Sequence, residues 1–529
     1  MSEKEQVSKA AGIVGLATLA SRVMGYIRDM VMSWAFGAGM AADAFYVAYR
    51  IPNLLRELLA EGSMSAAFIP VFTETLTKSS KEDARHLGNA VFARLLVILI
   101  VLTALGILFA PSIVKAIAWG FGTHREKYVL TVTLTKIMFP YLLFIGLAAL
   151  AMGMLNSLRS FLSPALSPVM FNLMTIMAVL VLAPLFPNPI LGAAIGVVLG
   201  GMCQFLIQIP GLKRHGMILR PRFKPSHPGV KKIGMLVLPV FVSSSVTQLN
   251  IFISTILASF LATGSITYLF YGMRFIHFPL GLFGIAIATA VLPTMSAQAA
   301  RRETAEFRET LSHGLRLVSF ITFPAMAGLI ALRIPIVNLL LERGEFDRLS
   351  TIGTASALLY YAIGLWAFAG VRIAVQAFYS LQDTRTPVKI AVIALISNVL
   401  FSILLMGPLA HGGLALATSL AAMINLGLLT VMLRRKIGRI DGRRILQSLL
   451  KIIPVSALMW GIGWWVSLNP AWSLPGNTLY KLGLLLAGIS ASAGFYLLAM
   501  WVLRSEEMIF LWAMVQKWRA RRWPKGDEV

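Results

Sequence analysis

The sequence predicts an all-α integral membrane protein with about fourteen transmembrane helices. Hydrophobic residues make up 57% of the 529 residues, charged residues only 13%, and the mean hydropathy is +0.78. Soluble domains have about 25% charged residues, so this composition indicates a chain dissolved in lipid. Residues 95–114 and 482–503 form uncharged stretches of the roughly 20 residues that a helix needs to cross the hydrocarbon core. Helices are expected because lipid cannot satisfy an unpaired backbone group.

Apolar runs separated by proline, glycine and charged residues predict the fourteen spans. Their centres lie near residues 23, 55, 101, 141, 173, 200, 246, 282, 324, 365, 396, 423, 458 and 491. The first ten residues carry mixed charge, and no small-residue cleavage site follows them. We therefore expect the first span to be retained rather than removed as a signal peptide.

Basic residues alternate between loops and predict the orientation of the chain. Segment 213–232 holds seven Lys or Arg residues and no acidic residue, segment 434–444 holds six, and the tail from Arg504 holds six. The loops GAGMAA, PLFPNPI and NPAWSLPGN hold none. Because cytoplasmic loops collect Lys and Arg, both termini are predicted to lie in the cytoplasm. The net charge of +25 then reflects topology, and we expect no nucleic-acid partner.

Three pairs of motifs indicate an internal repeat of six helices. DAFYVAYR, starting at Asp43, resembles TYLFYGMR, starting at Thr267; NSLRSFLSP resembles YSLQDTRTP, and GAAIGVVLG resembles GLALATSLA. The pairs keep their order at offsets of 221 to 224 residues. An even number of helices gives both copies one orientation, related by an axis along the membrane normal. We predict two six-helix lobes, residues 1–223 and 224–440, and an added helical pair with a basic cytoplasmic tail in residues 441–529.

The first span contains Arg22, Arg28 and Asp29, which are costly in a membrane. An Arg or Asp near a helix centre costs about 2.5 to 3.5 kcal/mol on insertion scales, so these residues need compensation. Arg22 and Asp29 are seven residues apart and share one helix face, whereas Arg28 points in another direction.

The second span repeats this arrangement of charge. Asp43, Arg50 and Glu57 follow a seven-residue spacing, and Arg56 points in a second direction. Pro52 interrupts the backbone hydrogen-bond ladder and predicts a bend. Both spans therefore direct charge into the protein interior at more than one depth.

Two hypotheses explain these charges. In the first, they form interhelical ion pairs that hold the first lobe together, with Arg50 paired to Asp43 or Glu57. In the second, four arginines provide planar guanidinium groups suited to phosphate, in a water-filled cavity between the lobes. These arginines are Arg22, Arg28, Arg56 and, from the second lobe, Arg274. Such a cavity would suit an anionic substrate that carries at least one phosphate.

The same residues lie in motifs that resemble a known family. SRVMGYIRD, FGAGMAADAFYVAYRIPNLLRELLAEGSMSAAFIPVF, YGMRFIHFPLGLFGIAIATAVLP and FYSLQDTRTPVKI are similar to the MurJ (MviN) lipid II flippases of the MATE-like exporter superfamily. The resemblance covers essentially the whole chain. It implies a bacterial inner-membrane protein that moves undecaprenyl-diphosphate-linked disaccharide-pentapeptide outward for peptidoglycan synthesis, by alternating access between two lobes. It also implies that the last two helices form a groove for the lipid tail.

The resemblance implies roles for individual residues. The functionally important arginines of the family match Arg22, Arg28, Arg56 and Arg274. The predicted supporting residues of the cavity are Asp29, Asp43, Arg50, Asn53 and Glu61. Met273 stands where the family is expected to have Asp or Asn, which removes a carboxylate role at that position but leaves the role of Arg274.

Other polar residues have simpler expected roles. His277 is predicted to be a satisfied interior histidine, with a proton relay as the alternative. Asp383 with Arg385 is predicted to form a helix cap or a local pair rather than to take part in transport. Four amides are expected to hold helices together, with an ion site as the alternative. They are Gln248, Asn250, Gln376 and Asn398.

The sequence contains no motif for hydrolysis. The patterns GxxxxGK[ST], HExxH and GxSxG do not occur, so a transporter rather than an enzyme is predicted, without a cofactor. The energy is expected to come from a gradient of Na⁺, H⁺ or Cl⁻ or from the membrane potential. A single cysteine, Cys203, excludes an internal disulfide and a cysteine-based metal cluster.

Three classes of function remain. A lipid II flippase explains the cationic cavity and the added helical pair, and a flippase for another polyprenyl-diphosphate oligosaccharide is its near alternative. A drug or cation antiporter of the same fold would be expected to show an acidic cavity and twelve helices. A non-transporting scaffold is disfavoured by the buried charges and the repeat. The expected partners are lipid II and membrane lipids, for a monomer with transient contacts to the cell wall synthesis machinery.

Overall fold

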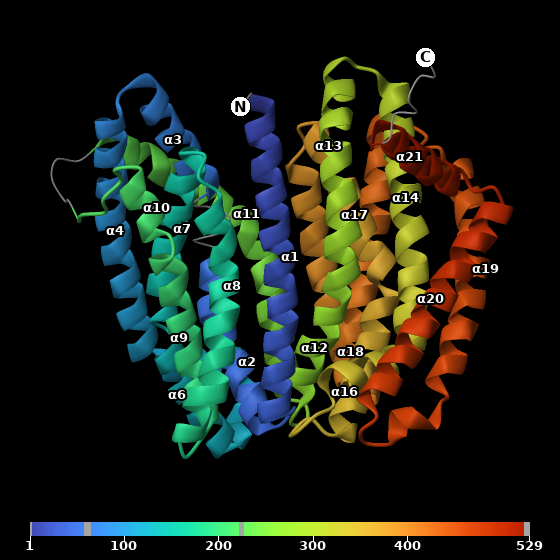
Figure 1. Cartoon of the computed structure of the whole chain (residues 1–529), viewed down its shortest axis with the longest axis horizontal. Coiled ribbons are helices and arrows are strands. Elements are labelled where there is room, and N and C mark those ends of the chain that lie inside the picture. The colour runs from blue at the N-terminus through green and yellow to red at the C-terminus, as the bar shows by residue number, and fades with distance from the viewer. Residues whose placement is uncertain (1–2, 58–64, 222–226, 523–529) are drawn as a thin grey trace, which may run out of the picture. The chain divides into compact units, whose positions relative to one another are not determined.

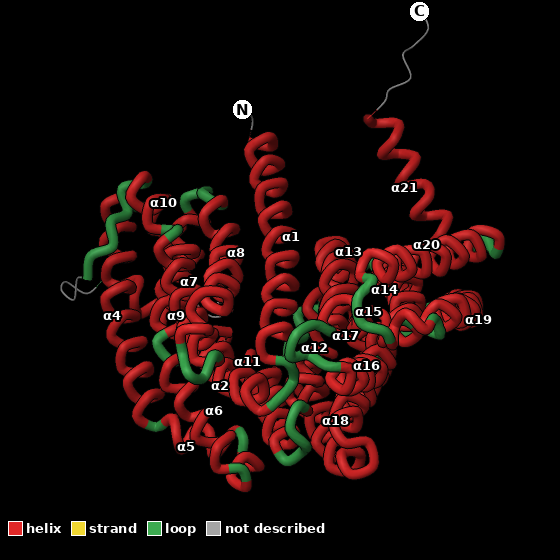
Figure 2. The backbone as a smooth tube through the Cα atoms, turned by 60° about the horizontal axis from the view of Figure 1, so that its bottom comes forward, coloured by secondary structure: helices red, strands yellow, loops and turns green. Residues whose placement is uncertain are grey.

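The computed structural model describes residues 3–57, 65–221 and 227–522. Within these ranges every regular element is a helix and no strand occurs (Figures 1 and 2). The chain divides into two compact units. Unit 1 comprises Met1–Thr267 and Arg343–Asp347, and unit 2 comprises Tyr268–Glu342 and Arg348–Val529. The predicted all-α class is therefore confirmed.

Unit 1 is built from eleven α-helices and the start of a twelfth. They are α1 (Glu3–Phe36), α2 (Met40–Arg56), α3 (Ser65–Lys78), α4 (Lys81–Leu108), α5 (Ala110–Ile117), α6 (Arg125–Met138), α7 (Tyr141–Ser157), α8 (Leu162–Met177), α9 (Ile190–Leu206), α10 (Ile209–Arg214) and α11 (Pro228–Ser259). A 3₁₀ turn, η2 (Trp119–Thr123), precedes α6, and the short turns η3 (Ala178–Leu182) and η4 (Ala183–Leu185) extend α8. The chain leaves this unit inside the first turn of α12 (Ser265–Pro279).

Unit 2 contains the remaining helices and the added pair. They are the rest of α12, η5 (Leu280–Gly284), α13 (Ile285–Ala300), α14 (Thr304–Ala331), α15 (Arg333–Leu341), α16 (Arg348–Ile363), α17 (Leu365–Ser380), α18 (Arg385–Ile437), α19 (Gly442–Ser467), η6 (Pro470–Ser473), α20 (Thr478–Val502) and α21 (Glu506–Arg522). At 53 residues α18 is too long for one membrane crossing, and its backbone is non-helical at Ala410, two residues after Pro408. Two predicted centres, 396 and 423, fall on either side of that break.

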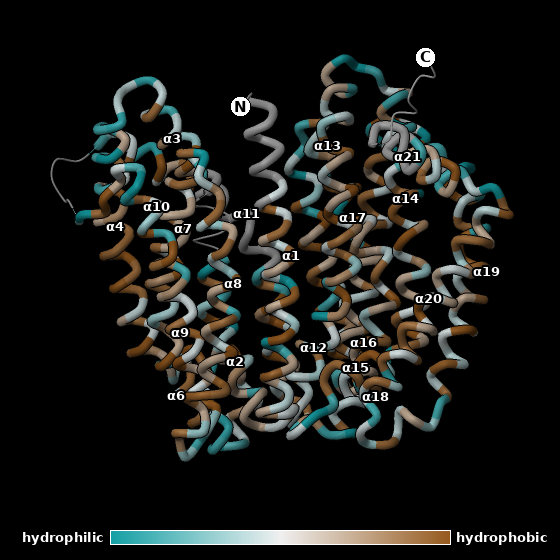
Figure 3. The backbone as a smooth tube through the Cα atoms, viewed as in Figure 1, coloured by the Kyte–Doolittle hydropathy of each residue, from teal (hydrophilic) through white to brown (hydrophobic). Residues whose placement is uncertain are grey.

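Long apolar helices dominate the described residues. Nine of these helices are long and apolar enough to cross a membrane, or ten if α16 and α17, bent by 43°, form one span. Figure 3 shows hydrophobic residues along the long helices and hydrophilic residues in many of the loops that join them. Every one of the fourteen predicted centres lies in a helical segment. The number fourteen itself stays a prediction.

The packing boundary differs from the boundary that the repeat predicts. The repeat predicts that a second lobe begins at residue 224, whereas the contacts assign α11 to unit 1 and divide the chain after Thr267. Polar contacts explain this assignment: Lys232 Nζ donates to Glu74 Oε2 at 2.6 Å, and Gly120 N donates to Ser259 Oγ at 3.0 Å. Because contacts do not test a sequence repeat, the two six-helix lobes stay a prediction.

Small residues bring α8 and α9 together. A Cβ atom added at Gly192, Gly196 or Gly200 would lie 2.4 to 2.8 Å from the nearest atom of the preceding helical segment. Glycine every fourth residue gives one helix face room for a close neighbour, which is a main source of helix association in lipid. At Gly200 this neighbour is Phe171 of α8. The Phe171 ring also contacts Arg28 of α1, whose guanidinium lies over it.

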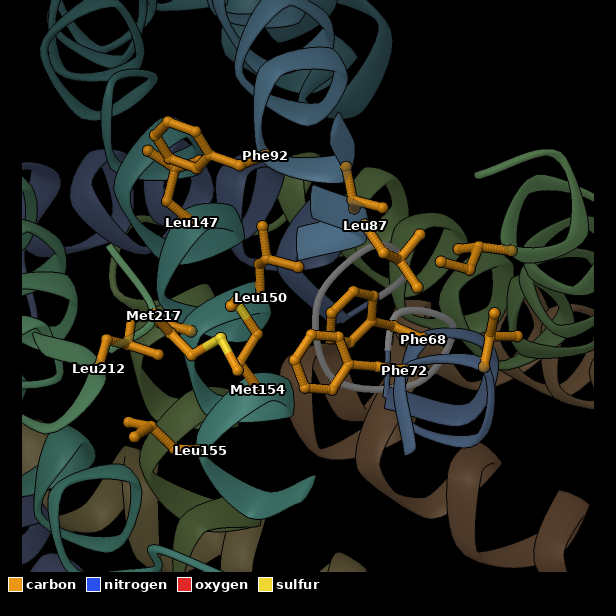
Figure 4. Packing of buried hydrophobic residues seen from close by; sticks show 14 of the residues in the cluster. Phe68, Phe72, Leu87, Phe92, Leu147, Leu150, Met154, Leu155, Leu212 and Met217 are labelled. Carbon is orange, nitrogen blue, oxygen red and sulfur yellow. The ribbon is translucent and has the colours of Figure 1, made fainter. Parts of the chain in front are cut away.

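The core of unit 1 lies between α3, α4 and α7. Phe68 and Phe72 of α3 stack with ring centroids 5.1 Å apart, and both are fully buried. Leu87 of α4 and Met154 of α7 belong to the same cluster (Figure 4). This packing explains why the motif AFIPVF is rich in large apolar residues.

Candidate functional site

The charged residues of α1 contain one tightly bonded pair. Asp29 is buried, and both Nε and Nη2 of Arg28 donate to its Oδ1, at 3.1 and 2.6 Å. The Arg28 guanidinium also lies over the Phe171 ring, 5.9 Å from its centroid. Both residues belong to one helix, so this pair does not connect α1 to another helix. It keeps the guanidinium of Arg28 in a fixed orientation.

Arg22 lies about two turns before Arg28 and is held differently. Its side chain is half-buried, and none of the residues that the structure describes pairs with its guanidinium. Close by, Asn172 of α8 donates through Nδ2 to the carbonyl oxygen of Ser21 at 3.2 Å, which fixes the backbone of α1 there. The structure therefore holds the helix at this point and leaves the arginine available for a ligand.

Arg56 belongs to a polar network at the end of α2. Its Nε donates to Asn53 Oδ1 at 3.0 Å, and Asn53 Nδ2 donates to Glu57 Oε1 at 3.0 Å. Gln248 Nε2 of α11 donates to Glu57 Oε2 at 2.6 Å. The predicted supporting residue Asn53 thus orients Arg56, and Gln248 joins α2 to α11.

Arg50 bonds to a different helix from the one expected. Its Nη1 donates to Thr255 Oγ1 of α11, and the Thr255 hydroxyl donates in turn to Ile251 O at 2.7 Å. The expected partner Asp43 is bonded to other residues. Arg50 therefore joins α2 to α11 within unit 1.

Asp43 is surrounded by donors. Lys127 Nζ of α6 donates to Oδ2 at 2.7 Å, and Gly264 N donates to the same oxygen at 2.8 Å. Thr267 donates twice to Oδ1, from its backbone N at 3.0 Å and from its hydroxyl at 2.7 Å. The exposed fraction is 1% for Asp43 and 3% for Lys127. These contacts leave the carboxylate inaccessible in this conformation, so the geometry favours a structural role over contact with a substrate.

The remaining predicted site residues are distributed over the chain. Arg274 lies in the unit 2 part of α12 and is half-buried, next to half-buried Met273. Glu61 lies outside the described residues. His277 is exposed rather than interior as expected. Asp383 bonds to Thr386 N at 3.0 Å, which confirms the predicted helix cap.

The sequence analysis did not identify two basic residues. Lys127 is the buried partner of Asp43, although it follows Arg125 and Glu126, which are both exposed. Arg372 lies in the middle of α17 with an exposed side chain. Arg372 could have been identified, because a lone arginine inside an apolar helix is visible in the sequence. The inward direction of Lys127 could not, because its neighbours Arg125 and Glu126 are also charged.

The added helices are bonded to the other helices of unit 2 near one end through a buried acid. Glu507 of α21 accepts from Arg316 Nη1 of α14 at 3.1 Å and from Ser448 Oγ of α19 at 3.0 Å. Arg316 and Glu507 are both buried. At another point Asn338 and Arg348 donate to the carbonyl oxygen of Trp472, at 3.2 and 3.0 Å. The pair α19 and α20 is therefore attached to the other helices of unit 2 at two places.

The described residues hold no cluster of three or more His, Cys, Asp or Glu side chains that could bind a metal. The site consists of arginines with carboxylate and amide partners. Such groups can bind an anion by charge-assisted hydrogen bonds, and guanidinium groups match a phosphate at two points.

Comparisons with known proteins identify a family for this chain. The family model described as lipid II flippase MurJ matches residues 32–479. A Vibrio cholerae protein named probable lipid II flippase MurJ is 38% identical over 432 residues, covering 80% of this chain and 82% of that protein. A Burkholderia cenocepacia protein named lipid II flippase MurJ is 35% identical over 491 residues, covering 92% and 95%.

Solved structures extend the likeness to the fold. A structure of lipid II flippase MurJ in an inward closed conformation matches with a TM-score of 0.76 at 27% identity, covering 93% of this chain and 99% of that one. An inward-facing multidrug transporter of the MATE family matches with a TM-score of 0.68 at 16% identity, covering 80% and 98%, which shows a shared fold. From the match over residues 32–479 and these full-length relatives, the chain belongs to the lipid II flippase MurJ family.

Proposed function

We propose that this protein flips lipid II, the undecaprenyl-diphosphate-linked disaccharide-pentapeptide, from the inner to the outer leaflet of the bacterial cytoplasmic membrane. The observation that carries the proposal is the family match over residues 32–479, together with a relative of that name aligned over 92% of the chain. The product is used in peptidoglycan synthesis, so the expected consequence of losing the protein is arrest of cell wall growth.

The topology proposed for this function has fourteen spans with both termini in the cytoplasm. The alternation of basic loops supports it, as do the helical segments at all fourteen predicted centres. Cysteines at Lys213 and Ser473, both exposed, should be labelled from opposite sides of the membrane in a chain with Cys203→Ser. Labelling of both from one side would overturn the fourteen-span topology.

The substrate diphosphate is proposed to bind the arginines, as two lobes alternate access to it. Arg22 has a guanidinium that no described residue pairs with, and Arg28 is bonded within its own helix. A phosphate can replace Asp29 as the partner of Arg28 without breaking an ion pair between two helices. Arg56 is oriented by Asn53, and Arg274 is assigned the same role by its position in the family motif.

The polyprenyl tail is proposed to stay in lipid beside α19 and α20. The tail is long and apolar, and a charged site would exclude it. Exposed large side chains along these helices, such as Leu458, Trp465 and Leu486, are suited to contact it. Because the pair is attached to unit 2 through Trp472 and Glu507, a tail bound there would follow unit 2.

The energy for flipping is proposed to come from a gradient of Na⁺, H⁺ or Cl⁻ or from the membrane potential. The sequence has no hydrolytic motif that could couple nucleotide hydrolysis to transport. A potential of 100 mV contributes about 2.3 kcal/mol for each charge moved across the membrane. We propose a monomer without a cofactor, in transient contact with the cell wall synthesis machinery.

The direct test of function is rescue of cells depleted of their lipid II flippase. We expect this chain to restore growth and lipid II exposure on the outer leaflet. If the chain instead rescues cells that lack a different polyprenyl-diphosphate flippase, the substrate is another lipid-linked oligosaccharide. Failure to rescue either strain, with drug or cation exchange measured instead, would favour an antiporter of the same fold.

A further inference from the structure

The start of α12 is held by a carboxylate that belongs to α2. Gly264 N, Thr267 N and the Thr267 hydroxyl all donate to Asp43, so this side chain caps the helix in place of a local residue. A helix N-terminus presents unpaired N–H groups and a partial positive charge, which an anion stabilises. The cap therefore fixes the position of the first turn of α12 along the helix axis and its rotation about that axis.

A cap of this kind places a carboxylate in a buried site. Removing a carboxylate from water is unfavourable unless a positive partner compensates its charge. Lys127 is that partner: its Nζ lies 2.7 Å from Asp43 Oδ2, and its side chain is 3% exposed. The ammonium also lies 4.3 Å from the centroid of the buried Phe121 ring, which stabilises a cation.

The side chain of Lys127 points inward, unlike those of its charged neighbours. Arg125 and Glu126, the two preceding residues of α6, are exposed, whereas Lys127 is directed to α2. Arg125 therefore serves as a matched control, because it is a basic residue two positions away that does not contact Asp43.

The capped helix also carries one of the proposed substrate ligands. Thr267 is the last residue of unit 1, and α12 continues into unit 2 from Tyr268. Arg274 follows Thr267 by seven residues, which places both on one helix face about two turns apart. Thr267 and Arg274 are therefore neighbours along one face of the same helix.

We propose that Lys127 is a positioning residue for flipping. Its ammonium compensates the buried carboxylate of Asp43, so that Asp43 holds the first turn of α12, the helix that carries Arg274. The role of Arg274 rests on the proposed function, whereas the anchoring of α12 by Lys127 and Asp43 does not.

The test measures the anchoring apart from transport. Ser265, in the first turn of α12, is buried, so Ser265→Cys reports release of this turn. In the purified full chain carrying Cys203→Ser, Lys127→Met should raise the labelling rate of that cysteine by N-ethylmaleimide at least about tenfold, as expected for loss of one charge-assisted hydrogen bond. Lys127→Arg should keep it near the parent rate, and so should the control Arg125→Met.

A double variant separates positioning from stability. Asp43→Asn with Lys127→Met removes both buried charges, so thermal stability should return toward the parent value. The neutral amide holds α12 more weakly, so labelling should remain several-fold above the parent rate and lipid II flipping in cells should remain below it. Parent-level labelling and flipping in this double variant would overturn the positioning role, as would unchanged labelling in Lys127→Met. If labelling follows the expected order in a chain that does not flip lipid II, the anchoring stands and the proposed function fails.

Discussion

The two membrane aspartates of unit 1 are held in opposite ways. Asp43 is bonded by three residues from two separate segments, namely Lys127 of α6 and Gly264 and Thr267 at the start of α12. Asp29 is equally buried, but its charged partner Arg28 is the adjacent residue of the same helix. Withdrawing Asp43 from its bonds would separate helices, whereas exchanging the partner of Arg28 would not.

This difference indicates which charges are available for a ligand. A charge that joins several segments is part of the scaffold, because its bonds and the helix packing are lost together. A charge bonded within its own helix, or not paired at all, can bind a ligand without a change in packing. Arg22 and Arg28 form no ion pair with another helix and are of the second kind, although the Arg28 guanidinium also lies over the Phe171 ring of α8. Asp43 with Lys127 is of the first kind. The same seven-residue spacing of charged residues therefore occurs both for a scaffold residue, Asp43, and for a residue available to a ligand, Arg22.

Removing Asp43 should produce the largest loss of stability. Asp43→Ala leaves the Lys127 ammonium buried without its carboxylate, which costs about 3 to 5 kcal/mol. We expect membrane abundance to fall sharply and the unfolding temperature of the purified protein to drop. Asp29→Ala, in which Arg28 is already partly exposed, should lose less. If the two substitutions lower stability equally, the distinction between the two aspartates is wrong.

The acid that attaches α21 should show the next largest effect. Glu507→Gln keeps an acceptor for Ser448 but removes the charge that compensates buried Arg316, at a cost of about 1 to 3 kcal/mol. Glu506 also contacts Arg316, but its side chain is 64% exposed, so Glu506→Gln should cost about 0 to 1 kcal/mol. Thermal unfolding of both variants compares a buried partner with an exposed one. Equal effects would contradict the assignment of Glu507 as the attachment point.

The bond between α2 and α11 should contribute less. Gln248→Ala removes a single side-chain hydrogen bond to Glu57, and such bonds within membranes are worth about 0.6 kcal/mol on average. We expect a small fall in unfolding temperature and normal abundance. A loss as large as that of Asp43→Ala would show that Gln248 does more than join two helices.

The smallest effect is expected at the half-buried helix cap Asp383, where it depends on pH. Bonds from Lys436 and Thr386 lower the pKa of Asp383 below its ordinary value. Because the folded pKa is depressed, the contribution of Asp383 to stability is present above the ordinary pKa of an aspartate. It is lost as the pH falls through the folded value. The difference in unfolding temperature between the parent and Asp383→Asn should therefore shrink from pH 7 to pH 3, and a constant difference would exclude the linkage.

Much of the fold was predictable because lipid imposes simple rules. Apolar length predicted helices at all fourteen centres, and Pro408 marks the break that divides α18. The packing of α11 in unit 1 was not predictable, because a repeat reports ancestry of segments and not which side chains meet. Lys127 was missed for a related reason: three consecutive charged residues do not show which one turns inward. Of the site, the sequence indicated the arginines, whereas their different bonding required the structure.

The most direct test of this account is lipid II exposure on the outer leaflet for Arg22→Ala. The test uses cells that depend on this chain as their lipid II flippase. None of the described residues pairs with this guanidinium, so the substitution should leave abundance and unfolding temperature near the parent values. If Arg22 binds the diphosphate, lipid II exposure should fall about tenfold or more, as expected for loss of a charge-assisted contact. Arg22→Lys should give an exposure between those of the parent and of Arg22→Ala. Parent-level flipping by Arg22→Ala at normal abundance would contradict the claim that the available arginines bind the substrate.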